Sequence, residues 1–242
     1  MSSQEQNTET SRRPVATTDR PSQIRVVIAE SAPAIREYLA ATLAAEEAIE
    51  LVAACADGEQ LEEALASERP DVLVTDVRIP PSQGDEGIRI ARSLGERDPC
   101  MGVVLLSQYA EAAYVLSLLE SGSARAYLLT ERLSERGELI DAIETVADGG
   151  IVVDPEIVGS LIEARARVAR SPLPRLDRGE RQLLALVAAG RRDLAIARSL
   201  GTEERLVAVR IDALFEKLDL HCPRDASQRT QSALAYLAEE GD

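Results

Sequence analysis

The sequence predicts a two-domain protein, in which an α/β domain with a doubly wound parallel sheet precedes an all-α domain. Three observations lead to this prediction. Between residues 23 and 148, short apolar runs alternate with apolar residues at helical spacing, which is typical of alternating strands and helices. From residue 176 onward every periodic pattern is helical. A length of 242 residues suits two domains of modest size.

Five short apolar runs are the predicted strands of the first domain. They contain mostly Val, Ile, Leu and Ala with little alternation, which is typical of strands buried on both faces of a parallel sheet. A helical pattern follows each run, and such a series favours a flavodoxin-like, doubly wound fold. The predicted strands span residues 24–29, 49–53, 71–75, 101–106 and 124–129, and the predicted helices span residues 35–43, 59–65, 87–94, 111–119 and 135–147.

Turn-forming residues divide the rest of the chain. Gly149 and Gly150 end the first domain, and residues 149–175 are a predicted connector with a helix over 156–169 and a Pro-containing linker over 171–174. Gly190 and Gly201 separate the first three of four predicted helices, as in a helix-turn-helix bundle. The helices span 178–189, 193–199, 203–218 and 227–239, so the second domain covers 176–242; the polar residues 1–22 are a predicted disordered tail.

Charge and composition limit the classes of function. Residues 23–150 contain 24 acidic and 10 basic residues, whereas residues 176–242 contain 12 acidic and 10 basic residues. The nearly neutral second domain predicts weak non-specific affinity for DNA. An aromatic content of 2% argues against stacking on single-stranded nucleic acid. Three scattered cysteines, no signal peptide and no apolar run of spanning length predict a cytoplasmic protein without a membrane partner.

Polar residues follow four of the predicted strands. In a doubly wound sheet, ligands bind at the carboxyl ends of the strands, so these side chains are expected to face one crevice. A carboxylate there can accept a phosphoryl group, hard oxygen ligands can hold Mg²⁺, and a hydroxyl can hydrogen-bond the new phosphoryl oxygens. The residues are Glu30 and Ser31 after the first strand, Asp76 after the third, Ser107 after the fourth and Thr130 after the fifth.

The first domain resembles the receiver domain of two-component response regulators. The resemblance rests on VVIAES at 26–31, VLVTDVRIPP at 72–81, GVVLLSQY at 102–109 and AYLLTER at 126–132. GGIVVDPEIVGSLI at 149–162 is similar to the connector of NarL/FixJ-type regulators, and residues 80–91 and 106–116 resemble an actinobacterial branch of that family. The resemblance implies that Asp76 is the phospho-acceptor and that Glu30 helps to hold Mg²⁺. It also implies that Ser107 is the switch hydroxyl and that the rotamer of Tyr127 follows it.

Two positions differ from the receiver pattern. Ser31 occupies the place of an Asp that ligates Mg²⁺, and Thr130 occupies the place of a Lys that pairs with the phosphoryl group. Weaker Mg²⁺ binding and a less stable phosphorylated state are expected, because a negative ligand and a charge-assisted hydrogen bond are lost. Two hypotheses follow: a phosphorylated receiver with Asp76 as acceptor, and a pseudo-receiver that works without phosphate.

Residues 176–220 resemble the LuxR-type helix-turn-helix domain, through the opening at 180–186, Gly190, the IARSLG segment at 196–201 and the KL pair at 217–218. The resemblance implies that the helix near 203–218 lies in the major groove of double-stranded DNA and that the last helix serves dimerisation. Arg205 and Arg210 are candidates for base contacts, and Val209 for a thymine methyl group. Candidates for contacts with the DNA backbone are Arg191, Arg192, Arg198 and Lys217.

Three functions remain open from the sequence. The first is a transcription regulator that responds to a sensor histidine kinase and binds DNA as a homodimer. The second is an interaction module that forms a heterodimer with an intact response regulator; the neutral Ala208 and acidic Asp212 on the recognition helix favour it. The third is a flavodoxin-like enzyme that binds a nucleotide or flavin, which the lack of a Gly-rich phosphate loop disfavours, so the protein is expected not to be an enzyme.

Overall fold

The structure is a computed structural model. It describes residues 23–80, 85–120, 122, 124–134, 136–167 and 172–238. The predicted tail over residues 1–22 and a part of the predicted linker lie outside the described residues. Within them, no helix is both long and apolar enough to span a membrane.

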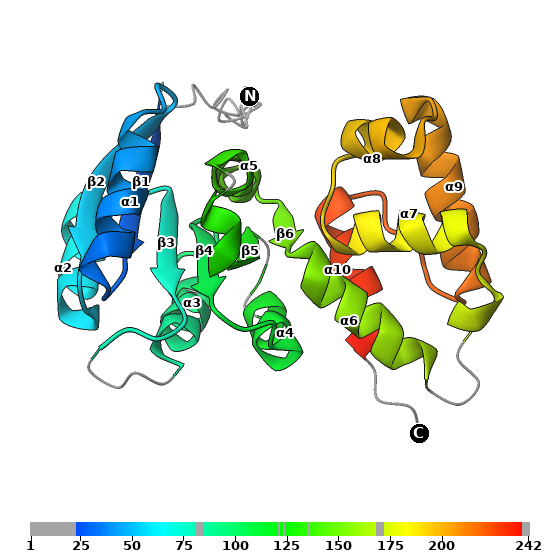
Figure 1. Ribbon diagram of the computed structural model, residues 1–242, viewed down its shortest axis with the longest axis horizontal. Coiled ribbons are helices and arrows are strands. Elements are labelled where there is room, and N and C mark those ends of the chain that lie inside the picture. Colours follow the sequence, from blue (N-terminus) through cyan, green and yellow to red (C-terminus); the bar gives the residue numbers. More distant parts are fainter. Residues whose placement is uncertain are drawn as a thin grey trace, which may run out of the picture.

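The first domain is built on one parallel sheet (Figure 1). Its order, β2-β1-β3-β4-β5-β6, places β1 between β2 and β3, as a doubly wound fold requires. The central strands are buried almost throughout, which explains their continuous apolar sequence. The strands are β1 Ile24–Ala29, β2 Ile49–Cys55, β3 Val72–Asp76, β4 Gly102–Ser107, β5 Arg125–Leu129 and β6 Ile151–Val153.

Helices cover both faces of the sheet. One apolar cluster joins the sheet to α1 and α5 through Leu39, Leu43 and Ile143. The other joins it to α2, α3 and α4, and it continues through β6 into the helical domain. These helices are α1 Pro33–Ala44, α2 Gly58–Glu68, α3 Glu86–Arg97, α4 Ala112–Glu120 and α5 Arg136–Ala147.

The predicted number of five strands is wrong, because the sheet has six. Residues assigned to the connector form β6, which pairs with β5 in the register Tyr127↔Val153. The buried Asp154 fixes the end of this strand: its backbone N–H donates to the Tyr127 carbonyl at 2.9 Å, and its carboxylate accepts from Arg132 at 3.2 Å. The connector therefore begins inside the sheet.

The second domain consists of helices, as predicted. A capping box begins α7, since the Asp177 carboxylate accepts from the Glu180 N–H and Glu180 accepts from the Asp177 N–H. Gly201 ends α8 in the left-handed conformation (φ 61°), which makes the turn into α9. The helices are α6 Pro155–Ala166 in the connector, then α7 Arg178–Ala188, α8 Asp193–Leu200, α9 Glu204–Lys217 and α10 Ala226–Ala238.

The two domains are docked against each other. Helix α10 packs on α4, α6 and β6, and its residues Leu234 and Leu237 are buried within the chain (Figure 1). Ser227 Oγ donates to the Gly149 carbonyl at 3.1 Å. The apolar side of α10, which the resemblance assigns to dimerisation, is therefore covered by the same chain in this arrangement.

Candidate functional site

A polar pocket of about 300 Å³ lies at the carboxyl ends of β3 and β4. These strands end at Asp76 and Ser107, so the parallel sheet brings the two side chains to one edge. Arg78 and Tyr109 form a second pair at the pocket, with the guanidinium carbon 5.5 Å from the ring centre. The pocket is lined by Ser31, Asp76, Val77, Arg78, Ser107, Gln108, Tyr109, Glu111 and Tyr114.

Two carboxylates at this edge of the sheet, those of Asp76 and Glu30, are partly or fully buried. Burial raises the pKa of Asp76 above its ordinary value, although the Arg78 charge and two backbone N–H groups act in the opposite direction. Burial also raises the pKa of Glu30, and the nearby Asp76 charge adds to this effect. Glu30 is only 4% exposed, and its Oε1 accepts from the Ala32 N–H at 2.7 Å. Asp76 is thus the more accessible of the two.

Ser107 and Tyr127 meet at one backbone carbonyl. Ser107 Oγ donates to the Tyr109 carbonyl oxygen at 3.1 Å, and the Tyr127 hydroxyl donates to the same oxygen at 3.0 Å. Tyr127 is fully buried, and burial raises its pKa. A movement of the Ser107 hydroxyl toward Asp76 would remove one donor from this carbonyl, so the positions of Ser107, Tyr109 and Tyr127 are physically coupled.

Three of the five polar strand-end residues meet at this pocket, because Ser31, Asp76 and Ser107 line it. Glu30 lies close enough to Asp76 for the Asp76 charge to raise its pKa, and the placement of Thr130 at the same crevice stays a prediction. Glu30 is turned toward the backbone of residue 32, as described above. Thr130 begins the 3₁₀ turn Thr130–Ser134, directly after β5.

Arg78 is a pocket residue that the sequence reasoning missed. It lies two positions after Asp76, beyond the end of β3, where the chain bends at Val77. Its closeness to Asp76 in the sequence is the signal that could have found it. Its charge opposes the effect of burial on the pKa of Asp76. Arg78 therefore brings a positive charge to the pocket, beside the Asp76 carboxylate.

Gly87 brings the start of α3 against the backbone of Asp76. A Cβ atom at residue 87 would lie 2.1 Å from the Asp76 carbonyl oxygen, far inside van der Waals contact. The Gly87 N–H donates to the Val77 carbonyl at 3.0 Å. A glycine is required here by close backbone approach and not by an unusual dihedral angle.

In the helical domain, three of the basic residues predicted to contact DNA form ion pairs with acidic residues. Lys217 Nζ lies 2.7 Å from Glu180 Oε2, and its hydrogen bond lowers the pKa of Glu180. Arg205 Nε lies 2.6 Å from Glu203 Oε2. Arg192 Nη2 lies 2.9 Å from Asp148 Oδ2, which belongs to the first domain. These exposed pairs are weak and leave each cation free to exchange partners.

The outward face of α9 is open to solvent. Val209 is 63% exposed, so it is not packed in the bundle core, whereas Val207 and Phe215 on the inner face are fully buried. Arg205 and Arg198 are exposed, and Arg210 is half-buried. The geometry leaves the helix that follows the Gly201 turn accessible from outside, while Arg191 lines a pocket between the domains.

Comparison with known proteins identifies the family. Residues 26–144 match the response regulator receiver domain. The chain is 31% identical over 198 residues to the probable transcriptional regulatory protein NarL of Mycobacterium tuberculosis, which covers 82% of this chain and 89% of that relative. The chain belongs to the NarL-type response regulators.

Other comparisons agree with this assignment. The transcriptional regulatory protein DegU of Brevibacillus brevis is 29% identical over 232 residues, with 89% of this chain and 93% of that protein covered. Among solved structures, the response regulator RcsB of Salmonella typhimurium matches with a TM-score of 0.51 at 22% identity, over 90% of this chain and 99% of that chain. This likeness supports the two-domain fold of a response regulator.

The receiver pocket of this response regulator offers few ligands for a cation. Asp76 and Glu30 supply two carboxylates, and Ser31 supplies a neutral hydroxyl. Among the described residues, no group of three or more His, Cys, Asp or Glu side chains could hold a metal ion. The oxygen donors suit Mg²⁺ in kind, but their charge is small for this ion. The adjacent His221 and Cys222 form no metal site either, and burial raises the pKa of the Cys222 thiol to about 11.

Proposed function

We propose that this chain is a DNA-binding transcription regulator of a two-component system, whose receiver domain accepts a phosphoryl group on Asp76. The observation that supports this most is the position of Asp76: it is a half-buried carboxylate at the end of β3, beside the Ser107 hydroxyl and the Arg78 cation. The transcriptional regulators NarL and DegU are similar over most of the chain. A sensor histidine kinase would be the phosphoryl donor, and the cytoplasm the location.

The pocket residues fit the requirements of such a transfer. An Asp76 oxygen would attack the phosphorus of the donor, and the bond between phosphorus and the donor's leaving group would break, which leaves an acyl phosphate on Asp76. Ser107 would donate a hydrogen bond to a phosphoryl oxygen. Arg78 would supply the positive charge that a Lys at residue 130 would otherwise bring. Mg²⁺, held weakly by Asp76 and Glu30, would offset part of the phosphoryl charge.

Incubation with acetyl phosphate and Mg²⁺, followed by intact mass measurement, tests this half of the proposal. The wild-type chain is expected to gain one phosphate adduct, and the Asp76→Asn variant none. An Arg78→Ala variant is expected to accumulate less adduct than an Arg78→Lys variant, because only the latter keeps the cation. An unmodified wild-type chain at high acetyl phosphate and Mg²⁺ concentrations would contradict phosphorylation and favour a pseudo-receiver.

The DNA-binding half rests on the open face of α9. Arg205 and Arg210 would contact base edges and Val209 a thymine methyl group, while Arg191, Arg192, Arg198 and Lys217 would contact phosphates. Solved structures of RcsB include complexes with DNA, among them one of two dimers. Fluorescence anisotropy with a labelled duplex tests binding. Affinity should fall as salt rises, and lack of binding at low salt would refute this half.

A second candidate function is that of a phosphate-independent regulator that forms a heterodimer with another response regulator. Two observations favour it: residue 130 is a neutral Thr where a receiver has a Lys, and Glu180 and Glu203 partly neutralise Lys217 and Arg205. Gel-shift experiments with and without a candidate partner distinguish the two. Tight binding of DNA by the pure homodimer would rule out the need for a heterodimer.

A further inference from the structure

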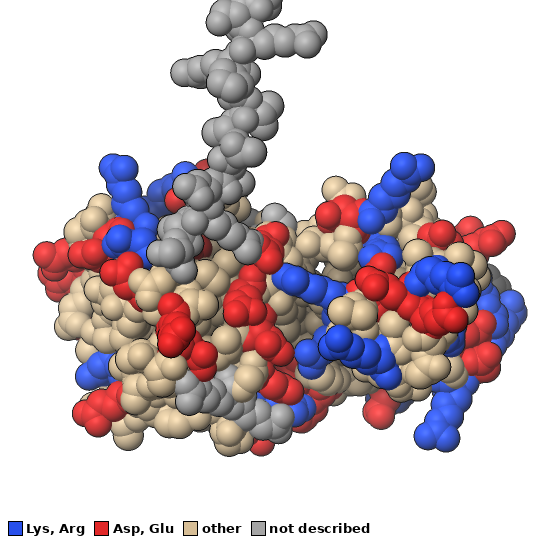
Figure 2. All heavy atoms as spheres, turned by 90° about the horizontal axis from the view of Figure 1, so that it is seen from above, with Lys and Arg blue, Asp and Glu red and all other residues tan. Residues whose placement is uncertain are grey.

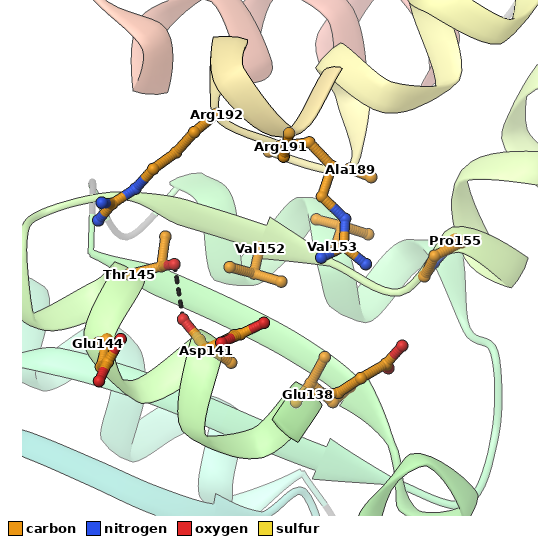
Figure 3. Close-up of a pocket in the computed structure, with 14 residues that line it drawn as sticks. Glu138, Asp141, Glu144, Thr145, Val152, Val153, Pro155, Ala189, Arg191 and Arg192 are labelled. Carbon is orange, nitrogen blue, oxygen red and sulfur yellow. Dashed lines mark hydrogen bonds between the residues drawn. The ribbon is translucent and has the colours of Figure 1, made fainter. Parts of the chain in front are cut away.

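A cavity of about 220 Å³, which we call the junction cavity, lies between the receiver domain and the helical domain. Helix α5 and strand β6 form one side of it, and the turn between α7 and α8 forms the other (Figure 3). A water molecule takes up about 30 Å³ of the liquid, so the cavity has room for about seven of them. This space suits a ligand of the size of an amino acid, whereas drug-sized ligands occupy larger pockets.

Backbone contacts beside the cavity keep its two sides together. Gly190, at φ +76°, lies so close to β6 that a Cβ atom there would be 1.7 Å from the Ile151 carbonyl oxygen. The Val153 N–H donates to the Ala189 carbonyl at 3.4 Å. The junction cavity is therefore formed before any ligand arrives, which lowers the entropic cost of binding.

One wall of the junction cavity is acidic. Glu138, Asp141 and Glu144 follow one another at intervals of three residues on one side of α5, while Ile143 is buried against the sheet. Arg132 Nε lies 3.9 Å from Glu138 Oε2. Within the described part of the chain, the carboxylates of Asp141 and Glu144 have neither a hydrogen bond nor an ion pair. This wall thus offers charge that the protein itself leaves unpaired.

The opposite wall carries the guanidinium group of Arg191. This half-buried side chain extends over β6 into the cavity (Figure 3). Among the residues that the structure describes, no carboxylate lies within 4.0 Å of it, whereas Arg192 binds Asp148 at 2.9 Å and is 65% exposed. Acidic and basic side chains face each other across the domain junction in the space-filling view (Figure 2). The Arg191 charge is therefore available to a ligand.

Apolar surface separates the two charged walls. Val152 and Val153 of β6 and Pro155 at the start of α6 line the cavity between them. A ligand that fits must have a short hydrocarbon chain for this surface and charged groups of both signs at its ends. Three carboxylates face one free guanidinium, so the ligand should carry more positive than negative charge.

We propose that the junction cavity is a binding site for a small molecule with one carboxylate and two ammonium or guanidinium groups, which is the chemistry of a basic amino acid. The ligand carboxylate pairs with Arg191, and its cationic groups pair with the row of carboxylates on α5. This inference goes beyond the proposed function and does not depend on it. Because the ligand contacts both domains, it stabilises the folded arrangement that holds them together.

Isothermal titration calorimetry of the full chain at low salt tests the proposal, with L-lysine as the probe. L-lysine should bind with a dissociation constant of about 1 mM or lower. Two analogues are matched controls: L-norleucine lacks the side-chain ammonium group, and cadaverine lacks the carboxylate. Each should bind at least about 10-fold more weakly, because it leaves a charged group of the cavity without a partner.

Variants of the chain locate the binding. Asp141→Asn and Arg191→Ala should each weaken L-lysine binding by about 5-fold or more, whereas Glu37→Gln and Arg92→Ala remove exposed charges outside the cavity and should change it by less than about 2-fold. Absence of binding at about 10 mM L-lysine would overturn the proposal. Equal binding of L-norleucine, or an unchanged affinity in Asp141→Asn and Arg191→Ala, would overturn it as well. None of these outcomes bears on phosphorylation of Asp76 or on DNA binding.

Discussion

Replacement of Gly87 by Ala tests how closely α3 approaches the Asp76 backbone. The added methyl group would lie 2.1 Å from the Asp76 carbonyl oxygen and 3.1 Å from its carbonyl carbon. An ordinary contact begins near 3.4 Å, so the start of α3 or the end of β3 must move by about 1.3 Å. Neither segment moves easily, because Ile88 and Ala91 of α3 are buried in the core.

The magnitude follows from two opposing effects. Overpacking of this kind costs about 1–3 kcal/mol, and the better helix propensity of Ala offsets a part, so the free energy of unfolding should fall by about 1–2 kcal/mol. This corresponds to a decrease in Tm of about 2–8 °C for a chain of this size. The same movement of α3 or β3 should slow the phosphorylation of Asp76 by acetyl phosphate.

Gly159→Ala is the matched control. Gly159 lies in the middle of α6, and apart from the adjacent residues and the backbone of its own helix no atom of the described residues lies within 4 Å of its added Cβ. Without a clash, the substitution should raise the free energy of unfolding by about 0.5–1 kcal/mol. Urea denaturation of the two variants measures the difference. If Gly87→Ala stabilised the chain as Gly159→Ala does, the close approach of α3 to Asp76 would be refuted.

Three further predictions concern Asp76, Phe215 and Val209. Asp76→Asn should raise the urea midpoint near neutral pH, because burial raises the pKa of Asp76 and so penalises the charged form. The penalty appears as pH rises through the ordinary and raised pKa values, so the difference from wild type should vanish in acid; a constant difference would contradict it. Phe215→Ala should lower the free energy of unfolding by about 3–5 kcal/mol, since Phe215 is fully buried. Val209→Ala, on the exposed face, should change the free energy of unfolding by less than about 0.5 kcal/mol and should weaken duplex binding in anisotropy experiments; unchanged binding would contradict a contact of Val209 with DNA.

Sequence periodicity predicted most elements of the fold, because apolar spacing reports which face of each element is buried. The helix observed as α9, for example, starts and ends one residue inside the predicted 203–218. Strand β6 was not predicted, because its three residues are too few to show a periodic pattern. Its place in the sheet depends instead on pairing with Tyr127 and on the hydrogen bonds of Asp154.

The site was predictable where the chain reaches it directly from a strand. Asp76 and Ser107 follow from the parallel sheet, and Arg78 reaches the same pocket from the turn directly after β3. The contact of Arg192 with Asp148 was not predictable, because 44 residues separate them and no local pattern couples the two domains.

The apolar cluster that runs from the α2, α3 and α4 side of the sheet through β6 into the helical domain has a consequence for cooperativity. When one of two domains that share a continuous core unfolds, the other domain loses the apolar contacts between them. Calorimetry should therefore show one merged heat-absorption peak instead of two. Either half, if produced alone, would expose side chains such as Ile157 or Leu234 to water and would be prone to self-association.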